Sequence, residues 1–301
     1  MQRSWTEVRI VVPDGWGELV AGLFAERPFT GVAYGPTSLA TAPLPEGLGY
    51  LRAYVPSERD DEALRADVRR RLDELAEVVG ADELFELELR FHPLPEEDWA
   101  NSWKKSWRPF RCGDLAVVPK HYEGPLRPGD VRLVLDPGGV FGTGRHATTR
   151  TCLKVLQRRL EGGERALDAG CGTGILAAAA LLFGAEHVVG FDLDPSAATH
   201  FAELMDDNGL GERATFRDGG FEVLRPDERF DVVIANIYSD VIQTYALRLL
   251  DALEPGGWFV FSGCPKHHAR STRRALEAAG FELEAEHVRG LWHTFEGTRA
   301  K

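Results

Sequence analysis

The sequence predicts an α/β protein with a doubly wound, mainly parallel sheet and a C-terminal antiparallel hairpin, preceded by a small α+β domain. Three observations predict this architecture. From about residue 131 onward, short apolar strands alternate with helical segments, which is the order that builds a parallel sheet. Two glycine-rich turns there each join an apolar run to a helical pattern. The first ninety or so residues instead follow the order β-α-β-β-α-β.

Composition limits the class of protein. The chain has 301 residues, of which 44% are hydrophobic and 27% charged, and its net charge is -12. Such an acidic chain is unsuited to coating nucleic acid or an anionic membrane, although a basic protein partner stays possible. Its four cysteines include no C-x-x-C pair, so we expect neither a metal site nor disulfides. We expect a cytoplasmic monomer without a membrane segment.

Residues 1–94 form the first predicted domain, and its element order matches a ferredoxin-like sandwich. Its clearest element is the amphipathic stretch 57–80, where Ser57 is a candidate cap and Gly80 a candidate stop. A small domain of this kind usually binds another molecule. A purely structural role is the alternative.

Residues 95–130 are predicted to be a linker helix and a strand. Acidic residues lie at the start of this helix and basic residues at its end, as the helix dipole favours. Trp99, Trp103 and Trp107 recur every four residues and form one stripe. Such a stripe is more often used for packing than for ligand binding, so we expect the helix to dock between the domains.

Residues 131–301 form the second predicted domain, with strands and helices in alternation. The expected strands are 165–170, 187–194, 214–219, 230–237 and 258–263. The expected helices are 175–185, 196–209, 240–257 and 268–280. The tail 281–297 reads as two strands joined around Arg289-Gly290, a hairpin that would add an antiparallel strand to the sheet.

The turn after the first strand of this sheet is the expected ligand site. Glycines stand at Gly170, Gly172 and Gly174, but a dinucleotide fingerprint would also need glycine or alanine where the chain has Ile175. Asp168 fits poorly beside a pyrophosphate and well beside an ammonium and a sulfonium. S-adenosylmethionine carries both charges, and the glycines would let the backbone approach its aminoacyl portion. A tight turn without ligand is the alternative.

Carboxylates at the next two strand ends extend this site. Asp192 lies 22 residues after Gly170 and is the expected partner of both ribose hydroxyls. Asp194 is its rival, although capping the following helix explains Asp194 equally well. Asp218 is the candidate for the adenine amino group, with a turn aspartate as the alternative.

Asn236 ends the fourth strand, where the transferred methyl group would lie. Methyl transfer to nitrogen requires a neutral amine whose lone pair points at the methyl group. An asparagine oxygen and the following backbone carbonyl can accept the hydrogens of that amine and aim its lone pair. The alternative for Asn236 is a helix cap. Tyr238 would flank the amine and tolerate its cationic product, or it simply packs.

Five motifs together resemble the PrmA family of ribosomal protein methyltransferases, over roughly residues 95–301. They are "EEDWANSWKKSWRPF", "LDPGGVFGTGRHATTRTCL", "DAGCGTGILA", "GFDLDP" and "ANIYSDVI". The resemblance implies a class I S-adenosylmethionine-dependent protein N-methyltransferase. Its substrate would be large-subunit ribosomal protein eleven, recognised by the N-terminal domain and methylated on lysine side chains and its α-amino group.

The resemblance also assigns site residues. The positions that match cofactor contacts of the family are Thr149, Gly170, Asp192 and Asn236. Phe141 and the loop Gly142-Thr143-Gly144 match the segment that closes over the cofactor and the target amine. We therefore place Asn236, Phe141 and Tyr238 at the reaction centre.

The chain departs from the family on the acceptor side, at Arg145, Ala147 and Tyr238, where the family usually has threonine, proline and a small residue. We expect the Arg145 side chain to point outward, because a cation beside a sulfonium is unfavourable. His146 is interpreted as a loop hydrogen-bonding residue and not as a base.

Three other functions stay open. A methyltransferase of another protein or of a small amine keeps the cofactor and changes the acceptor. A non-catalytic cofactor-binding module would leave the work to the N-terminal domain, although Asp168, Asp192 and Asn236 are all present. A nicotinamide oxidoreductase is disfavoured by Ile175 and the G-x-G-x-G spacing.

Overall fold

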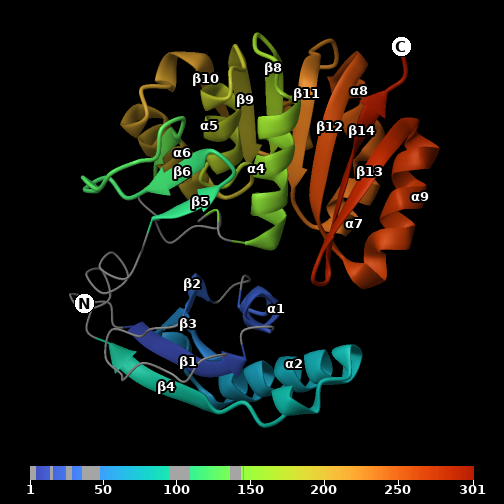
Figure 1. Cartoon of the computed structure of the whole chain (residues 1–301). Coiled ribbons are helices and arrows are strands. Elements are labelled where there is room, and N and C mark those ends of the chain that lie inside the picture. Colours follow the sequence, from blue (N-terminus) through green and yellow to red (C-terminus); the bar gives the residue numbers. More distant parts are fainter. Residues whose placement is uncertain are drawn as a thin grey trace. The chain divides into compact units, whose positions relative to one another are not determined.

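The computed structural model describes residues 5–13, 16–24, 29–35, 48–94, 109–135, 144 and 146–301. The chain divides into two compact units, Met1–Trp107 and Arg108–Lys301 (Figure 1). The predicted tryptophan-rich linker helix lies outside the described residues, and so do segment 136–143 and Arg145.

The first unit contains the expected order of strands and helices. Its elements are β1 (Trp5–Pro13), α1 (Gly17–Gly22), β2 (Thr30–Gly35), β3 (Leu48–Pro56), α2 (Glu62–Val79) and β4 (Leu89–Leu94). The strands form a four-stranded sheet in the order β2-β3-β1-β4, and each neighbouring pair is antiparallel. The alternating burial of β1 follows its alternating sequence, because successive side chains of a strand point to opposite faces.

Helix α2 covers one face of this sheet. Its Val68, Leu72 and Ala76 recur every four residues and pack against Val8 and Ile10 of β1 in one apolar cluster. The helix ends at Gly80 as predicted, with φ of +67°. The predicted cap Ser57 was wrong. It starts a short 3-10 helix, and α2 is capped by Asp61, whose carboxylate accepts a hydrogen bond of 2.8 Å from the Leu64 N–H.

The second unit begins with a three-stranded sheet in the order β5-β6-β7. These strands are β5 (Phe110–Cys112), β6 (Leu115–Val118) and β7 (Val131–Val134). Strands β5 and β6 are antiparallel, whereas β6 and β7 are parallel. Asn208, farther along the second unit, holds β7 in place. Its Oδ1 accepts a hydrogen bond from the Val134 N–H, and its Nδ2 donates one to the Val134 carbonyl, both at 2.8 Å.

A seven-stranded mixed sheet in the order β10-β9-β8-β11-β12-β14-β13 forms the body of the second unit (Figure 1). Its strands are β8 (Arg165–Ala169), β9 (His187–Asp192), β10 (Ala214–Asp218), β11 (Phe230–Asn236), β12 (Leu253–Pro265), β13 (Phe281–Arg289) and β14 (Trp292–Arg299). Its helices are α4 (Ala147–Arg159), α5 (Ile175–Leu182), α6 (Pro195–Asp207), α7 (Ser239–Thr244), α8 (Ala246–Ala252) and α9 (Ala269–Ala279).

The first five strands of this order are parallel, and the predicted C-terminal hairpin is confirmed. Strand β14 pairs antiparallel with β12, and β13 pairs with β14 at the edge of the sheet. The predicted helix 240–257 was too long. It is divided into α7 and α8, and the chain turns extended at Leu253, with φ of -90° and ψ of 134°. Pro255 explains the end of the helix, because it disfavours the helical conformation of the preceding residue.

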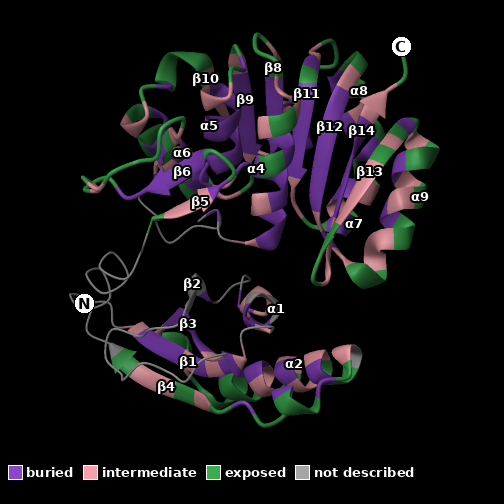
Figure 2. Ribbon diagram, viewed as in Figure 1, coloured by how far each residue is buried: buried purple, intermediate pink, exposed green. Residues whose placement is uncertain are grey.

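Helices cover both faces of the large sheet. On one face, alternate strand residues such as Leu167, Val233 and Phe259 form one apolar cluster with α7, α8 and α9. The residues between them face the other side, where α5 packs on β8 and β9 and α4 packs on β11, β12 and β14. Figure 2 shows the resulting pattern, with buried strands and helices exposed on their outer sides. Within the described residues, no helix is long and apolar enough to span a membrane.

Gly263 in β12 is a position at which a side chain should disturb this fold strongly. Its φ is +86°, and an added Cβ would overlap the backbone carbonyl of Ile237; Gly290 has φ of +57° and nothing within 4 Å of its added Cβ. We expect Gly290→Ala to lower the free energy of unfolding by about 1 kcal/mol, for backbone conformation alone. Gly263→Ala adds a backbone overlap and should cost about 2–4 kcal/mol. Urea denaturation of both variants measures this difference, and equal losses would contradict it.

Candidate active site

The carboxyl ends of four parallel strands bring the predicted site residues to one edge of the large sheet. Ala169 of β8 pairs with Ala235 of β11, so that Gly170 and Asn236 are the next residues of neighbouring strands. Asp192 at the end of β9 pairs with Asp218 at the end of β10. In a parallel sheet this edge is the usual place for a ligand. Residues that are 50 or more positions apart in the sequence therefore meet at this edge of the sheet.

The glycine turn after β8 needs its glycines for the fold itself. Gly170, Gly172 and Gly174 have φ of +69°, +53° and +83°, the left-handed region that residues with a Cβ avoid. An added Cβ at Gly170 would also overlap the Ile237 side chain, and one at Gly174 would lie 2.6 Å from the Phe201 ring. These glycines therefore set the conformation of the turn, which leads directly into α5.

Asp168 at the end of β8 is a buried acid with one unpartnered oxygen. Its side chain is only 1% exposed, and its Oδ2 accepts a hydrogen bond of 3.1 Å from the Ala177 N–H of α5. Its Oδ1 is buried and has no hydrogen-bond partner within the described residues. Burial raises the pKa of Asp168 from 3.8 to about 7; the Ala177 hydrogen bond opposes this rise, and the charge of Asp192 adds to it. A cationic ligand group would satisfy this oxygen.

Asp192 and Asp194 have different roles in the structure. Asp192 ties the glycine turn to the end of β9: its Oδ2 accepts from the Gly172 N–H at 2.7 Å and its Oδ1 from the Asp194 N–H at 2.9 Å. Asp194 caps α6 by accepting from the Ser196 N–H at 2.9 Å. A carboxylate oxygen accepts more than one hydrogen bond, so Asp192 retains capacity for a ligand. Asp218 beside it is exposed.

Asn236 and Thr149, which are 87 residues apart in sequence, meet at this edge. The Asn236 Nδ2 donates a hydrogen bond of 3.1 Å to the Thr149 Oγ1. Thr149 is buried in the first turn of α4. This bond fixes the amide so that its Oδ1, an acceptor, turns away from Thr149. Asn236 is not the N-cap of α7, because Tyr238 occupies that position without a side-chain capping hydrogen bond, and Tyr238 is 57% exposed.

His146 caps α4, which agrees with its interpretation as a hydrogen-bonding residue. Its Nδ1 lies 2.7 Å from the Thr148 Oγ1, and its ring packs edge-on against Trp292 of β14, with ring centroids 5.0 Å apart. Burial lowers the pKa of His146 to about 4. It is therefore a neutral cap at physiological pH. Sequence patterns did not reveal Trp292, because its contact with α4 depends on the place of β14 in the sheet.

The first glycine-rich segment is described only at its end. Phe141, like Gly142 and Thr143, lies outside the described residues. Gly144 is buried with φ of +77°, and an added Cβ would lie 2.5 Å from the Ile175 side chain. Ile175 directly follows the second glycine turn, so the ends of the two turns adjoin. The predicted sharing of one ligand by both turns stays a prediction.

No cluster of three or more histidine, cysteine or acidic side chains suited to a metal occurs among the described residues. All four cysteines are free and buried. The polar groups that this edge offers to a ligand are the carboxyl groups of Asp168 and Asp192 and the amide oxygen of Asn236.

The whole chain is similar to one family of proteins. A family model described as "Ribosomal protein L11 methyltransferase (PrmA)" matches residues 4–300. A ribosomal protein L11 methyltransferase of Pelotomaculum thermopropionicum is 34% identical over 315 residues, which cover 96% of this chain and 97% of that protein. Another, of Streptococcus pneumoniae serotype 4, is 33% identical over 309 residues, which cover 97% and 95%.

A solved structure agrees with these relatives. The ribosomal protein L11 methylase of Lactobacillus delbrueckii subsp. bulgaricus superimposes with a TM-score of 0.60 at 25% identity, covering 65% of this chain and 100% of that chain. The sequence matches span both units, whereas the structural match covers about two thirds of the chain.

Replacing Asp168 should change how stability depends on pH. The folded chain holds a proton on Asp168 up to a pH of about 7, whereas an exposed aspartate loses it near 3.8. Rising pH across this window therefore destabilises the folded state, by about 4 kcal/mol at most. The Asp168→Asn variant lacks this contribution. The free energy of unfolding of the variant should therefore increase relative to that of the wild type as the pH rises from 4 to 7.

Urea denaturation of the ligand-free protein at pH 4 to 8 measures this difference. Asp251→Asn, at an exposed site of α8, is the matched control and should follow the wild type. A constant difference between Asp168→Asn and the wild type over this range would show that Asp168 is ionised throughout.

Proposed function

The chain belongs to the ribosomal protein L11 methyltransferase family, and we propose that it uses S-adenosylmethionine to methylate amines of ribosomal protein L11. The observation that carries this proposal is the buried Asp168 with its unpartnered oxygen, at the same sheet edge as Asn236. Asp168 suits a positively charged, methyl-donating ligand, and Asn236 suits an amine acceptor. Methylation of another protein or a small amine is the weaker alternative, since the relatives are named for L11.

The cofactor fits the residues at this edge. S-adenosylmethionine supplies a methyl group on a positively charged sulfur. The unpartnered oxygen of Asp168 suits its ammonium, and the carboxylate of Asp192 suits the two ribose hydroxyls. Asp218 is the proposed partner of the adenine amino group. The remaining proposed cofactor contacts are Thr149, Asn236 and the backbone of Gly170, Gly172 and Gly174.

Asn236 is proposed to orient the acceptor amine. A lysine amine has an ordinary pKa of roughly 10.4, so it must lose a proton before it can react. The Thr149 hydroxyl holds the Asn236 amide nitrogen, which leaves the Asn236 oxygen to accept a hydrogen of the neutral amine. The backbone carbonyl of Ile237 is the second acceptor. The contribution is the alignment of the lone pair, which lowers the entropic part of the barrier.

Two aromatic residues complete the proposed reaction centre. Tyr238 follows Asn236 by two residues, and its exposed ring suits a place beside the amine, where its face would stabilise the cationic product. Phe141 is proposed to close over the cofactor and the amine from the first glycine-rich segment. We propose that the departures at Arg145, Ala147 and Tyr238 adapt this acceptor side.

We propose that the first unit is a ferredoxin-like domain that recognises the substrate protein. Its strand order β2-β3-β1-β4 and its two helices support this proposal. In this proposal residues 1–94 are the recognition domain, 95–130 the linker, and 131–301 the catalytic domain. The enzyme would work as a monomer in the cytoplasm, and its net charge of -12 suits a basic substrate protein.

Variants at Asn236 and Asp192 should separate catalysis from cofactor binding. Asn236→Ala should lower kcat about a hundredfold and cofactor affinity much less, because its main effect is the loss of amine positioning. Asp192→Ala should weaken cofactor affinity about tenfold or more, because it removes the ribose acceptor and loosens Gly172.

Calorimetric titration with S-adenosylmethionine and initial-rate kinetics measure the two effects. Asp194→Ala is the control for Asp192, since loss of a helix cap should lower stability by about 1 kcal/mol and leave affinity nearly unchanged. An unchanged rate in Asn236→Ala removes that residue from the mechanism.

Methyl transfer itself tests the proposed function. The purified chain, labelled S-adenosylmethionine and a mixture of free ribosomal proteins should yield label on L11, at lysine and α-amino nitrogens. Mass spectrometry of the labelled protein identifies those nitrogens. Label on a different protein, with none on L11, refutes the proposed substrate and leaves the cofactor assignment standing.

A further inference from the structure

The segment from Asn236 to Ser239, here called the acceptor segment, carries the proposed acceptor groups and is held at both of its ends. At its start, the Asn236 Nδ2 donates a hydrogen bond to the Thr149 Oγ1. At its end, the Ser239 Oγ lies 2.8 Å from the His268 Nδ1, so that a hydrogen bond joins the first residue of α7 to the short 3-10 helix Lys266–His268 before α9. Ser239 is only 2% exposed. The segment on which the amine would be aligned therefore has a fixed beginning and a fixed end.

The middle of the acceptor segment is enclosed by glycine backbone. An added Cβ at Gly263 of β12 would overlap the Ile237 carbonyl, and one at Gly170 would overlap the Ile237 side chain. Gly263 and His268 are only five residues apart in the sequence. One short stretch of chain after β12 therefore contacts the acceptor segment twice, at Ile237 through Gly263 and at Ser239 through His268.

A second contact joins the same two helices one turn farther on. Gln243 lies four residues after Ser239, and Thr272 lies four residues after His268. The Gln243 Nε2 donates a hydrogen bond of 3.0 Å to the Thr272 Oγ1, and the Cys264 Sγ lies 3.3 Å from the same oxygen. Thr272 is fully buried. Two comparable contacts thus hold α7 on α9, but only the first includes a residue of the acceptor segment.

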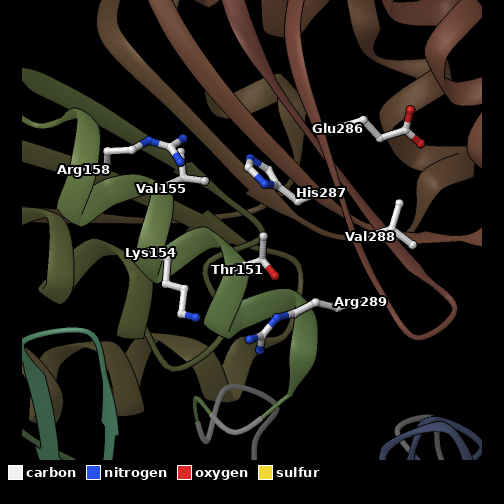
Figure 3. Close-up of a pocket in the computed structure, with 8 residues that line it drawn as sticks. All are labelled: Thr151, Lys154, Val155, Arg158, Glu286, His287, Val288 and Arg289. Atoms are coloured by element: carbon white, nitrogen blue, oxygen red, sulfur yellow. The ribbon is translucent and has the colours of Figure 1, made fainter.

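Neither contact belongs to the pocket of about 390 Å³ on the second unit. That pocket lies between α4 and β13, and Figure 3 shows the side chains that surround it. Helices α7 and α9 cover the other face of the large sheet, and neither of them lines the pocket. Any effect of His268 on the reaction must therefore act through Ser239 and the acceptor segment, and not through this pocket.

A displaced acceptor segment should slow turnover more than it weakens binding. The Asn236 oxygen aligns the amine only when it is correctly placed, and a misplacement of about 1 Å can cost about a hundredfold in rate. Loss of the contact between Ser239 and His268 releases one end of the segment, while the bond to Thr149 still holds the other. The expected loss is therefore smaller than for removal of Asn236 itself.

We propose that His268 is a positioning residue for methyl transfer. Through Ser239 it holds the segment that carries Asn236 and the Ile237 carbonyl, so that the acceptor amine is aligned with the methyl group. His268 acts without touching the amine or the cofactor. This inference rests on the proposed function and adds to it a residue from the turn before α9.

Kinetics with intact L11 test the inference. Ser239→Ala and His268→Leu should each lower kcat about five- to tenfold, and should change KM for L11 and Kd for S-adenosylmethionine less than about twofold. The double variant should lose no more than either single variant, because both changes remove the same hydrogen bond. His268→Asn retains a polar group near the position of the Nδ1, so its kcat should stay within about twofold of the wild type.

Thr272→Val is the matched control. It removes the second contact between α7 and α9, together with the contact to Cys264, and keeps the shape of the side chain. The melting temperatures of Thr272→Val and Ser239→Ala should both fall by roughly 2–4 °C, because each variant loses a hydrogen bond. Only Ser239→Ala should lose turnover, whereas Thr272→Val should keep the kcat of the wild type. Thermal denaturation and initial-rate kinetics measure the two effects.

The outcomes separate the two proposals. If the wild-type enzyme does not methylate L11, the proposed function fails and the inference fails with it. If it does, an unchanged kcat in Ser239→Ala overturns the inference and leaves the proposed function intact. An equal fall of kcat in Thr272→Val also overturns the inference, because it would show a general effect of loosening α7. So does a fall in His268→Asn as large as that in His268→Leu.

Discussion

The second unit depends on keeping a carboxylate inside its sheet. Asp168 is buried at the end of β8, with one oxygen held by the Ala177 N–H and the other without a partner among the residues that the structure describes. Such a group destabilises the folded protein, because burial disfavours its charged form. The surrounding chain is arranged to tolerate it: the glycine turn allows α5 to begin beside it and to direct an N–H at it. In the proposed function this buried carboxyl serves to bind the cationic part of the cofactor.

Two hydrogen bonds hold the rest of the site in place before any ligand arrives. The first, from the Gly172 N–H to Asp192, joins the turns after β8 and β9. The second, from Asn236 to Thr149, joins the end of β11 to the first turn of α4. Both connect segments that are far apart in sequence, and both fix an acceptor oxygen at the same edge. A site that is already ordered loses less conformational entropy when it binds its ligand.

Much of the fold and of the candidate site could be predicted from the sequence. The ends of parallel strands converge at one edge of a sheet, and glycine turns mark these strand ends. The hairpin and the capping role of Asp194 followed from local patterns. The cap of α2 and the end of α8 were missed, because Ser57 and Asp61 are both acceptable caps and apolar spacing continues past Ala252. The contact between His146 and Trp292 could not be foreseen, because it depends on the place of β14 beside β12 in the sheet.

The order of strands at that edge has a consequence for the newly synthesised chain. Strand β13 precedes β14 in sequence, yet β14 occupies the place beside β12, and β13 pairs only with β14. When β13 emerges from the ribosome, its only neighbour in the sheet has not yet been made, and the edge of β12 is open. The edge of the sheet is therefore completed last, when β14 is inserted between β12 and β13.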